Sequence, residues 1–203
     1  MGEDFERVWG KRLAAKLGFS ANDAQVSDLA DNLLRLMARD RADFTCTFAA
    51  LAESLRAQDG EALFCAEFAD TDAAGAWWQS WHAAITDHAR REAANGAPAD
   101  TAAAAVNAKT YAAPNAGGDA KHGENNDAMQ AVLARLAHAN PACIPRNHLV
   151  EAALEAAVDG DDLRPFTDLF EALTEHPRGV APPPWLSRPP ETPDPHYRTF
   201  CGT

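Results

Sequence analysis

The sequence predicts an all-α protein: a helical bundle with a long flexible insertion and an extended, proline-rich C-terminal tail. Apolar residues recur at the three- and four-residue spacing of amphipathic helices over most of the 203 residues. No segment of useful length alternates apolar and polar residues as a half-buried strand does. Hydrophobic residues make up 46% of the chain, which is enough to bury a core, although many of them are alanine.

Residues 1–94 are expected to form the N-terminal helices of the bundle. Gly18 follows the first apolar stripe and predicts the end of that helix. Asp43 precedes the third stripe and is a residue type that caps helices. The three stripes are Phe5, Val8, Trp9, Leu13 and Leu17; Val26, Leu29, Leu33, Leu36 and Met37; and Phe44, Phe48, Leu51 and Leu55.

Aromatic residues gather at the end of this first part. Trp77, Trp78, Trp81 and Ile85 share one side of a predicted helix. The pattern favours a buried aromatic layer, and the alternative is a docking face for a partner domain. A platform for nucleobases is disfavoured because no basic residues interleave with the rings.

Residues 95–126 have a different composition. They contain an alanine run at 102–105 and a Gly117-Gly118 pair, but almost no large apolar side chains. Such a segment cannot bury enough apolar surface to offset the entropy of ordering. We therefore predict a flexible insertion or linker between two helical parts.

Residues 127–176 are expected to form a helix followed by a helical hairpin, and residues 177–203 an extended tail. Pro145 should lie in the first turn of the hairpin's first helix, Gly160 should end that helix, and Asp161 or Asp162 should cap the next. The tail holds seven prolines after Pro177. The apolar stripes are Met129, Val132, Leu133 and Leu136; Leu149, Ala153, Leu154 and Val158; and Leu163, Phe166, Leu169, Phe170 and Leu173.

The charge and the hydropathy pattern argue against two classes of partner. The formal net charge is -12, whereas binding to nucleic acid or to an anionic membrane surface needs clustered Lys and Arg. No stretch approaches the roughly 18 apolar residues of a membrane span. The acidic residues after Met1 are unlike a secretory signal. A cytoplasmic location is the expectation.

Motifs for catalysis or metal binding are missing from the sequence. Gly117-Gly118 is not followed by the Lys-Ser/Thr of a phosphate-binding loop, and no serine lies in a GxSxG frame. The spacing of the cysteines and histidines matches no metal motif, so a metal-dependent helical regulator is only a minor alternative. We assign no catalytic residue, cofactor site or metal ligand within this chain.

Two places have residues suited to a more specific role. Arg146, Asn147 and His148 follow a rigid Pro-containing turn, where they either tie helix termini together or face a partner domain and brace it. Cys201 lies third from the C-terminus, after the prolines, and a thiol on a terminus of that kind is a candidate redox residue. The other cysteines are expected to be free thiols in a reducing compartment: Cys46, Cys65 and Cys143.

The segments from Asn140 to Leu173, from Arg41 to Phe48 and from Tyr197 to Thr203 together resemble the selenoprotein O (SelO/YdiU) family of protein adenylyltransferases. The longest runs from Asn140 to Leu173 and has Asn-Pro, Arg-Asn, an acidic helix and Gly-Asp in the family's order. The run from Arg41 to Phe48, with Lys16-Leu17-Gly18 before it, resembles helices that follow the family's catalytic core. The end of the chain, Tyr197 to Thr203, is similar to the family's terminus.

The resemblance implies a function for the longer protein of which this chain would be one part. Family members have a protein-kinase-like fold, bind ATP with magnesium, and transfer AMP to Ser, Thr or Tyr hydroxyls of proteins. Their catalytic residues lie in an upstream domain that is absent here, so the chain would be an inactive C-terminal helical portion whose partner is that domain. Only Cys201 would inherit a role, because a terminal cysteine in the family can form a regulatory disulfide. The alternative is a free-standing helical protein-interaction module without catalysis.

Overall fold

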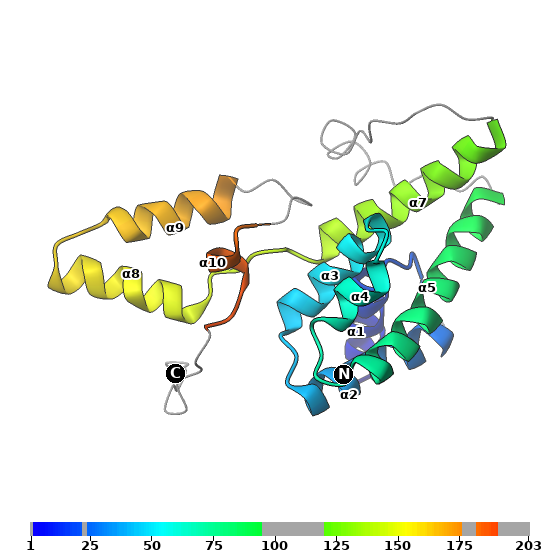
Figure 1. The fold of residues 1–203 in the computed structure, drawn as a ribbon, viewed down its shortest axis with the longest axis horizontal. Coiled ribbons are helices and arrows are strands. Elements are labelled where there is room, and N and C mark those ends of the chain that lie inside the picture. The colour runs from blue at the N-terminus through cyan, green and yellow to red at the C-terminus, as the bar shows by residue number, and fades with distance from the viewer. Residues whose placement is uncertain (1, 22–23, 95–119, 176–181, 191–203) are drawn as a thin grey trace. The chain divides into compact units, whose positions relative to one another are not determined.

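A computed structural model describes residues 2–21, 24–94, 120–175 and 182–190. Within these ranges every regular element is a helix, so the predicted all-α class is confirmed. Two compact units divide the chain, Met1–Pro141 and Ala142–Thr203. The helices, labelled in Figure 1, are α1 (Gly2–Lys16), α2 (Ala24–Asp40), α3 (Phe44–Arg56), α4 (Gly60–Cys65), α5 (Thr71–Ala94), α7 (Ala120–Ala139), α8 (Asn147–Asp159), α9 (Arg164–Glu175) and α10 (Pro184–Ser187).

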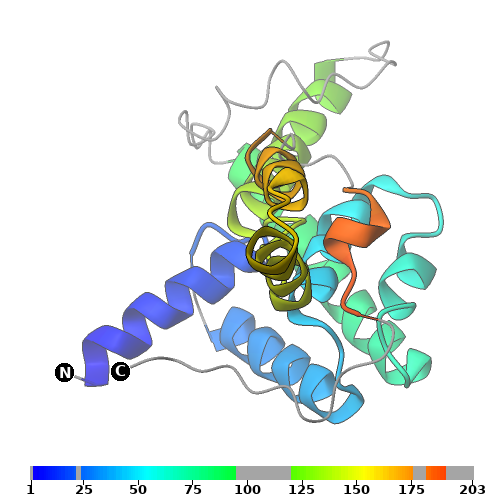
Figure 2. The same ribbon diagram turned by 90° about the vertical axis from the view of Figure 1, so that its left-hand side faces the viewer.

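In helices α1 and α2, the apolar stripe predicted from the sequence can be compared with the residues that are buried. All of the predicted stripe of α2 is buried, from Val26 to Met37. In α1 only the C-terminal half is buried, at Leu13 and Ala14, with Leu17 just beyond the helix. Phe5, Val8 and Trp9 are exposed, and Figure 2 shows the N-terminal end of α1, in blue, extending past the other helices of the first unit.

The expected stop and cap of these helices are confirmed. Gly18 has a φ of 88°, in the left-handed region where a side chain is strained. Asp43 accepts a hydrogen bond from the backbone N–H of Cys46 at 2.8 Å and caps α3. This bond satisfies one of the amide groups that a helix N-terminus leaves without a partner.

The aromatic residues of α5 form part of the core rather than a docking face. Trp77 and Trp81 are buried, and their rings stack at a centroid distance of 6.0 Å. Each indole N–H donates to a backbone carbonyl oxygen, that of Trp77 to Leu29 and that of Trp81 to Leu17. The buried aromatic layer is therefore confirmed, and its hydrogen bonds fasten α5 to α2 and to the end of α1.

Helix α7 begins earlier than the sequence predicted and completes the first unit. It starts at Ala120, so residues 120–126, assigned to the flexible insertion, are helical. Propagation adds one backbone hydrogen bond for each residue fixed, which lets a packed helix extend into a polar segment. Val132 and Leu136 anchor α7 in the core, where it packs on α1, α3 and α5. The rest of the predicted insertion, residues 95–119, lies outside the described residues.

The second unit is built around an antiparallel pair, α8 and α9, as predicted (Figure 1). Gly160 ends α8, but the left-handed residue is Asp161, with a φ of 49°. Asp162 accepts the backbone N–H of Arg164 at 3.0 Å at the start of α9. Pro145 precedes Arg146, the N-cap of α8, so it lies just before the helix rather than in its first turn.

The proline-rich tail is not extended throughout. The single-turn helix α10 starts at Pro184, a residue type that is favoured in a first turn because its fixed φ suits a helix. Leu186 within it is fully buried, which explains why the turn forms among prolines. Residues 176–181 and 191–203 lie outside the described residues.

Candidate functional site

The predicted bracing residues separate into one buried and two accessible side chains. Arg146 is buried, and its guanidinium donates to the carbonyl oxygen of Ser187 through Nε, at 2.9 Å, and through Nη2. Asn147 is exposed and His148 half-buried on the first turn of α8. The contact therefore joins the start of α8 to the end of α10, which is the helix-tying role that the sequence left open. Bracing of a partner domain by these residues stays a prediction.

Cys201, the candidate redox residue, lies outside the described residues. The cysteines that the structure describes are thiols outside any disulfide: Cys46, Cys65 and Cys143. Burial raises the pKa of the Cys143 thiol. Burial also raises the pKa of Cys65, and the charges of Glu61 and Asp72 raise it further. Neither of these two thiols has the lowered pKa that makes a cysteine nucleophilic.

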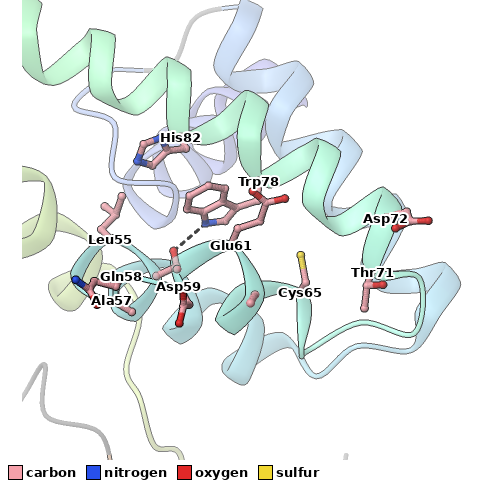
Figure 3. Close-up of a pocket in the computed structure, with 13 residues that line it drawn as sticks. Leu55, Ala57, Gln58, Asp59, Glu61, Cys65, Thr71, Asp72, Trp78 and His82 are labelled. Carbon is pink, nitrogen blue, oxygen red and sulfur yellow. Dashed lines mark hydrogen bonds between the residues drawn. The ribbon is translucent and has the colours of Figure 1, made fainter.

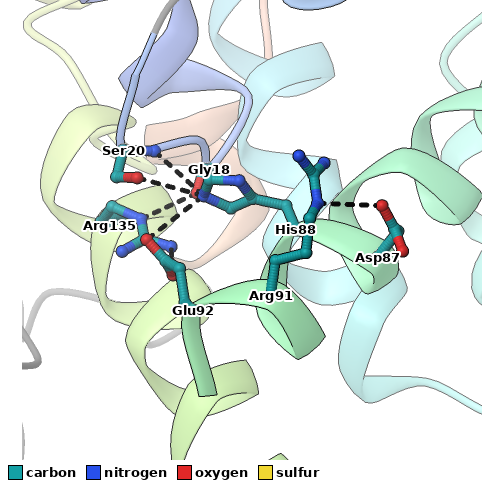
Figure 4. Close-up of polar contacts among 7 residues, drawn as sticks. All are labelled: Gly18, Ser20, Asp87, His88, Arg91, Glu92 and Arg135. Atoms are coloured by element: carbon teal, nitrogen blue, oxygen red, sulfur yellow. Dashed lines mark hydrogen bonds and ion pairs between the residues drawn. The ribbon is translucent and has the colours of Figure 1, made fainter. Parts of the chain in front are cut away.

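A polar cluster joins three elements of the first unit (Figure 4). Arg135 of α7 donates to the carbonyl oxygen of Gly18 at 2.8 Å and to the carboxylate of Glu92 at 2.7 Å. His88 lies one turn before Glu92 on α5, and its Nε2 is 3.3 Å from Glu92 Oε1. The same ring nitrogen lies 3.2 Å from the Oγ of Ser20. The cluster therefore links α5, α7 and the turn after α1.

This cluster contains Ser, His and Glu side chains, but its geometry is not that of a catalytic triad. A triad needs the serine on one imidazole nitrogen and the carboxylate on the other. Here Ser20 and Glu92 both face Nε2 of His88, so no proton relay crosses the ring. Burial is the main cause that lowers the pKa of His88; the charge of Glu92 opposes it, and the charges of Arg135 and Arg91 add to the lowering. The arrangement suits a structural tie.

The carboxylate in the cluster is held ionised. Burial alone would raise the pKa of Glu92, but hydrogen bonds from Arg135 and Ser20 and the charge of Arg135 lower it below the ordinary glutamate value. The ion pair to Arg135 has side chains only 15% and 20% exposed. A pair so shielded from water is screened less by salt than a surface pair.

A groove of about 670 Å³ lies between the end of α3, α4 and α5 (Figure 3). Trp78 and His82 stack at 4.7 Å on one wall, and the indole N–H of Trp78 donates to the Oγ of Ser54. The other lining residues include Asp59, Glu61 and Asp72. Three carboxylates beside one groove repel phosphate groups, so this groove does not suit a nucleotide.

The described residues also offer no set of ligands for a metal ion. No three His, Cys, Asp or Glu side chains converge within the ranges that the structure describes. The magnesium implied by the resemblance therefore has no matching set of ligands among the described residues. None of the described helices combines the length and the apolar character needed to cross a membrane.

Comparison with known proteins decides the relationship. The chain is 35% identical over 99% of its length to the protein nucleotidyltransferase YdiU of Rhodopseudomonas palustris (strain BisB5). It is 32% identical over 100% of its length to YdiU of Rhizobium johnstonii and 31% identical over 98% to YdiU of Bacillus cereus (strain ATCC 14579). The chain is related to the YdiU proteins over nearly its whole length. No family model and no solved structure matches it.

The match covers nearly all of this chain but only part of each YdiU relative. It covers 33% of the Rhodopseudomonas and Rhizobium proteins and 32% of the Bacillus protein. The chain thus spans about a third of the length of these relatives. The family resemblance predicted from the sequence is confirmed.

Sequence reasoning missed both the polar cluster and the groove. The spacing of His88 and Glu92 is that of neighbours on one helix face, which was the single local signal for the cluster. Arg135 lies 43 residues from Glu92 and beyond residues 95–119, so nothing in the sequence connected them. The groove depends on how α4 is placed between α3 and α5. No sequence motif predicts that placement.

Proposed function

We propose that this chain is the C-terminal helical region of a YdiU-type protein nucleotidyltransferase. The observation that carries the proposal is the match over nearly the whole chain to a third of each relative. The order of the resembling segments supports it, with the helices that follow the catalytic core first and Tyr197 to Thr203 last. In the longer protein, the activity would be transfer of AMP from ATP, with magnesium, to hydroxyl groups of protein substrates in the cytoplasm.

The role of this region would be to support a kinase-like domain rather than to catalyse. The first unit has a continuous core from Leu13 to Leu136, which makes it a rigid base. Asn147 and His148 lie on the accessible first turn of α8 and would contact the catalytic domain, while Arg146 fixes that turn to α10. Cys201 would supply a redox-sensitive link to the same domain.

A nucleotide-transfer assay tests this proposal. The chain is incubated with labelled ATP, magnesium and a protein acceptor, first alone and then with the unmatched two thirds of the Rhodopseudomonas palustris relative. We expect no labelled acceptor from the chain alone and more label from the mixture than from the two-thirds fragment alone. Label transferred by the chain alone, or no gain in the mixture, would contradict the proposal.

A free-standing helical interaction module is the second candidate function. One observation favours it: large apolar side chains of the second unit are exposed, among them Leu154, Phe166 and Phe170. The tryptophan layer cannot be its binding face, because Trp77 and Trp81 are buried. The test is a dye that binds exposed apolar surface. Displacement of the dye by a protein unrelated to YdiU, but not by the two-thirds fragment of YdiU, would favour this candidate.

A further inference from the structure

The two hairpin helices have apolar faces wider than their mutual contact can cover. Successive helical residues are about 100° apart around the axis, so Phe166 and Phe170 form one edge of the apolar face of α9, and Leu163 lies just before the helix. Leu169 and Leu173, on the other edge, are buried or half-buried. Helix α8 repeats the arrangement, with Ala153 buried and Leu154 and Val158 exposed.

We call the exposed apolar side chains of the hairpin the hairpin face: Leu154, Val158, Leu163, Phe166 and Phe170. Every one of these side chains is at least half exposed, from 51% for Leu154 and Phe166 to 80% for Val158. The rings of Phe166 and Phe170 stack at 6.4 Å with an angle of 14° between their planes, which places two exposed aromatic rings next to each other. Aromatic residues arranged in this way are typical anchors of protein interfaces.

The charge around the hairpin face indicates the chemistry of the partner. Residues 142–175 contain eight carboxylates and two arginines. Carboxylates of α8 and α9 near the face are exposed, including Glu155 and Glu171. A second copy of the chain would bring like charges together, which costs energy at an interface. A surface with an apolar centre and a basic rim complements the hairpin face instead.

We propose that the hairpin face binds the part of a YdiU polypeptide that lies outside the third matched by this chain. This inference rests on the proposed function and names the surface through which the two parts meet. Two thirds of each relative lies outside the match. That unmatched polypeptide is therefore the partner we expect at the hairpin face. Its contact surface should be an apolar groove bordered by Lys and Arg.

Binding of the full chain to a fragment tests the proposed surface. The probe is the Rhodopseudomonas palustris BisB5 relative without its matched third, checked first for binding to its own removed third. Phe166→Asp places a charge in the hairpin face, and Phe5→Asp is the matched control. Both residues are exposed helical phenylalanines that stack on an aromatic neighbour, Trp9 in the case of Phe5.

We expect the wild-type chain and Phe5→Asp to bind the probe with the same Kd, and binding to weaken as the salt concentration rises. Phe166→Asp should weaken binding about thirtyfold or more, as loss of an interface anchor does. Circular dichroism should show equal helicity for all three proteins, since neither residue is buried.

The other outcomes separate the two proposals. If the wild type fails to bind a probe that binds its own third, the proposed function falls together with this inference. If the wild type and Phe166→Asp bind equally well, or if both variants lose binding, only the hairpin face is refuted. A dimer of the chain alone in light scattering, abolished by Phe166→Asp, would assign the face to a second copy and overturn the inference.

Discussion

The hydroxyl of Thr47 is a single group whose burial carries a cost. Thr47 is fully buried in α3, and its Oγ1 has no hydrogen-bond partner among the described residues. A buried polar group without a partner costs about 1–3 kcal/mol, whereas a methyl group of similar size does not. Thr47→Val should therefore raise the free energy of unfolding by about 1 kcal/mol.

Urea denaturation of the wild type and of Thr47→Val measures this difference. Ser54→Ala is a useful contrast in the same helix, because the Ser54 hydroxyl donates to the carbonyl oxygen of Leu51 and accepts from Trp78. That variant should lose stability. A loss of stability in Thr47→Val as well would show that its hydroxyl has a partner after all.

His88 should make the stability of the protein depend on pH. Because the pKa of His88 is lowered in the folded chain, acidification protonates the unfolded chain first and favours unfolding. Its contribution is complete above the ordinary histidine pKa and is lost as the pH falls below it. The groups that face the ring are Ser20, Arg91, Glu92 and Arg135.

The measurement is the free energy of unfolding between pH 7 and pH 5 for the wild type and for His88→Gln. One titrating group can contribute at most about 1.4 kcal/mol per pH unit, and contact with solvent reduces this figure. The lowered pKa of Glu92 places its own transition at more acidic pH, outside this range. We expect a shallower slope in the variant, and an unchanged slope would contradict the role given to His88.

At the scale of elements, the turn after α1 depends on Gly18. A Cβ at this position would lie 3.2 Å from side-chain carbons of Val132 and Leu136 and 3.3 Å from Ile85, and the φ of 88° strains any side chain. Gly18→Ala should therefore cost about 1–3 kcal/mol, the usual range for a residue forced into such a conformation.

Thermal unfolding followed by circular dichroism tests this cost. Gly160→Ala is the matched control, because Gly160 also ends a helix but has a φ of -108°. Its added Cβ would lie 3.0 Å from the carbonyl oxygen of Ala156, a tight contact without conformational strain. The Tm should fall further for Gly18→Ala than for Gly160→Ala. Equal Tm values would show that the positive φ of Gly18 adds no cost.

Much of the fold was predictable because its signals are local. The stripe of α2, the Asp43 cap, the Gly18 stop and the α8–α9 pair all follow from residues within a few turns of each other. The predictions were wrong where the structure of a segment depends on contacts with residues distant in the sequence. Helix α10 depends on burial of Leu186, and the exposure of Phe5 and Trp9 reflects the lack of a neighbour that periodicity cannot reveal.

The candidate site was less predictable than the fold. Arg146 was singled out from the sequence, but the contact that the structure gives it, to the carbonyl oxygen of Ser187, joins residues 41 positions apart. The polar cluster around Arg135 likewise spans α5, α7 and the turn at Gly18. Pairing of polar side chains across elements follows from packing, and packing is a property of the assembled chain.

At the scale of the whole molecule, the two units differ in the size of their hydrophobic cores. The first unit contains the continuous apolar core, including Leu17, Leu33 and Trp81. In the second unit the buried apolar side chains of the described residues are Ala153, Leu169 and Leu186. A core so small leaves a unit of about 60 residues marginally stable.

A chain that ends at Pro141 should therefore fold by itself, whereas residues 142–203 alone should be only partly helical. Circular dichroism and hydrogen exchange of the full chain and of the two pieces would check this. We expect amides of α8 and α9 to exchange much faster than those of α2 and α5 in the full chain. Uniform protection across both units would contradict the difference in core size.

The stacked tryptophans of α5 also give the protein a built-in optical reporter. Trp77 and Trp81 lie nearly parallel, at 8° between ring planes, and both are shielded from water. Indoles held so close couple their electronic transitions, and that coupling vanishes once the rings separate. The near-ultraviolet dichroism and the blue-shifted emission of this pair would therefore follow the integrity of the first unit without any added label.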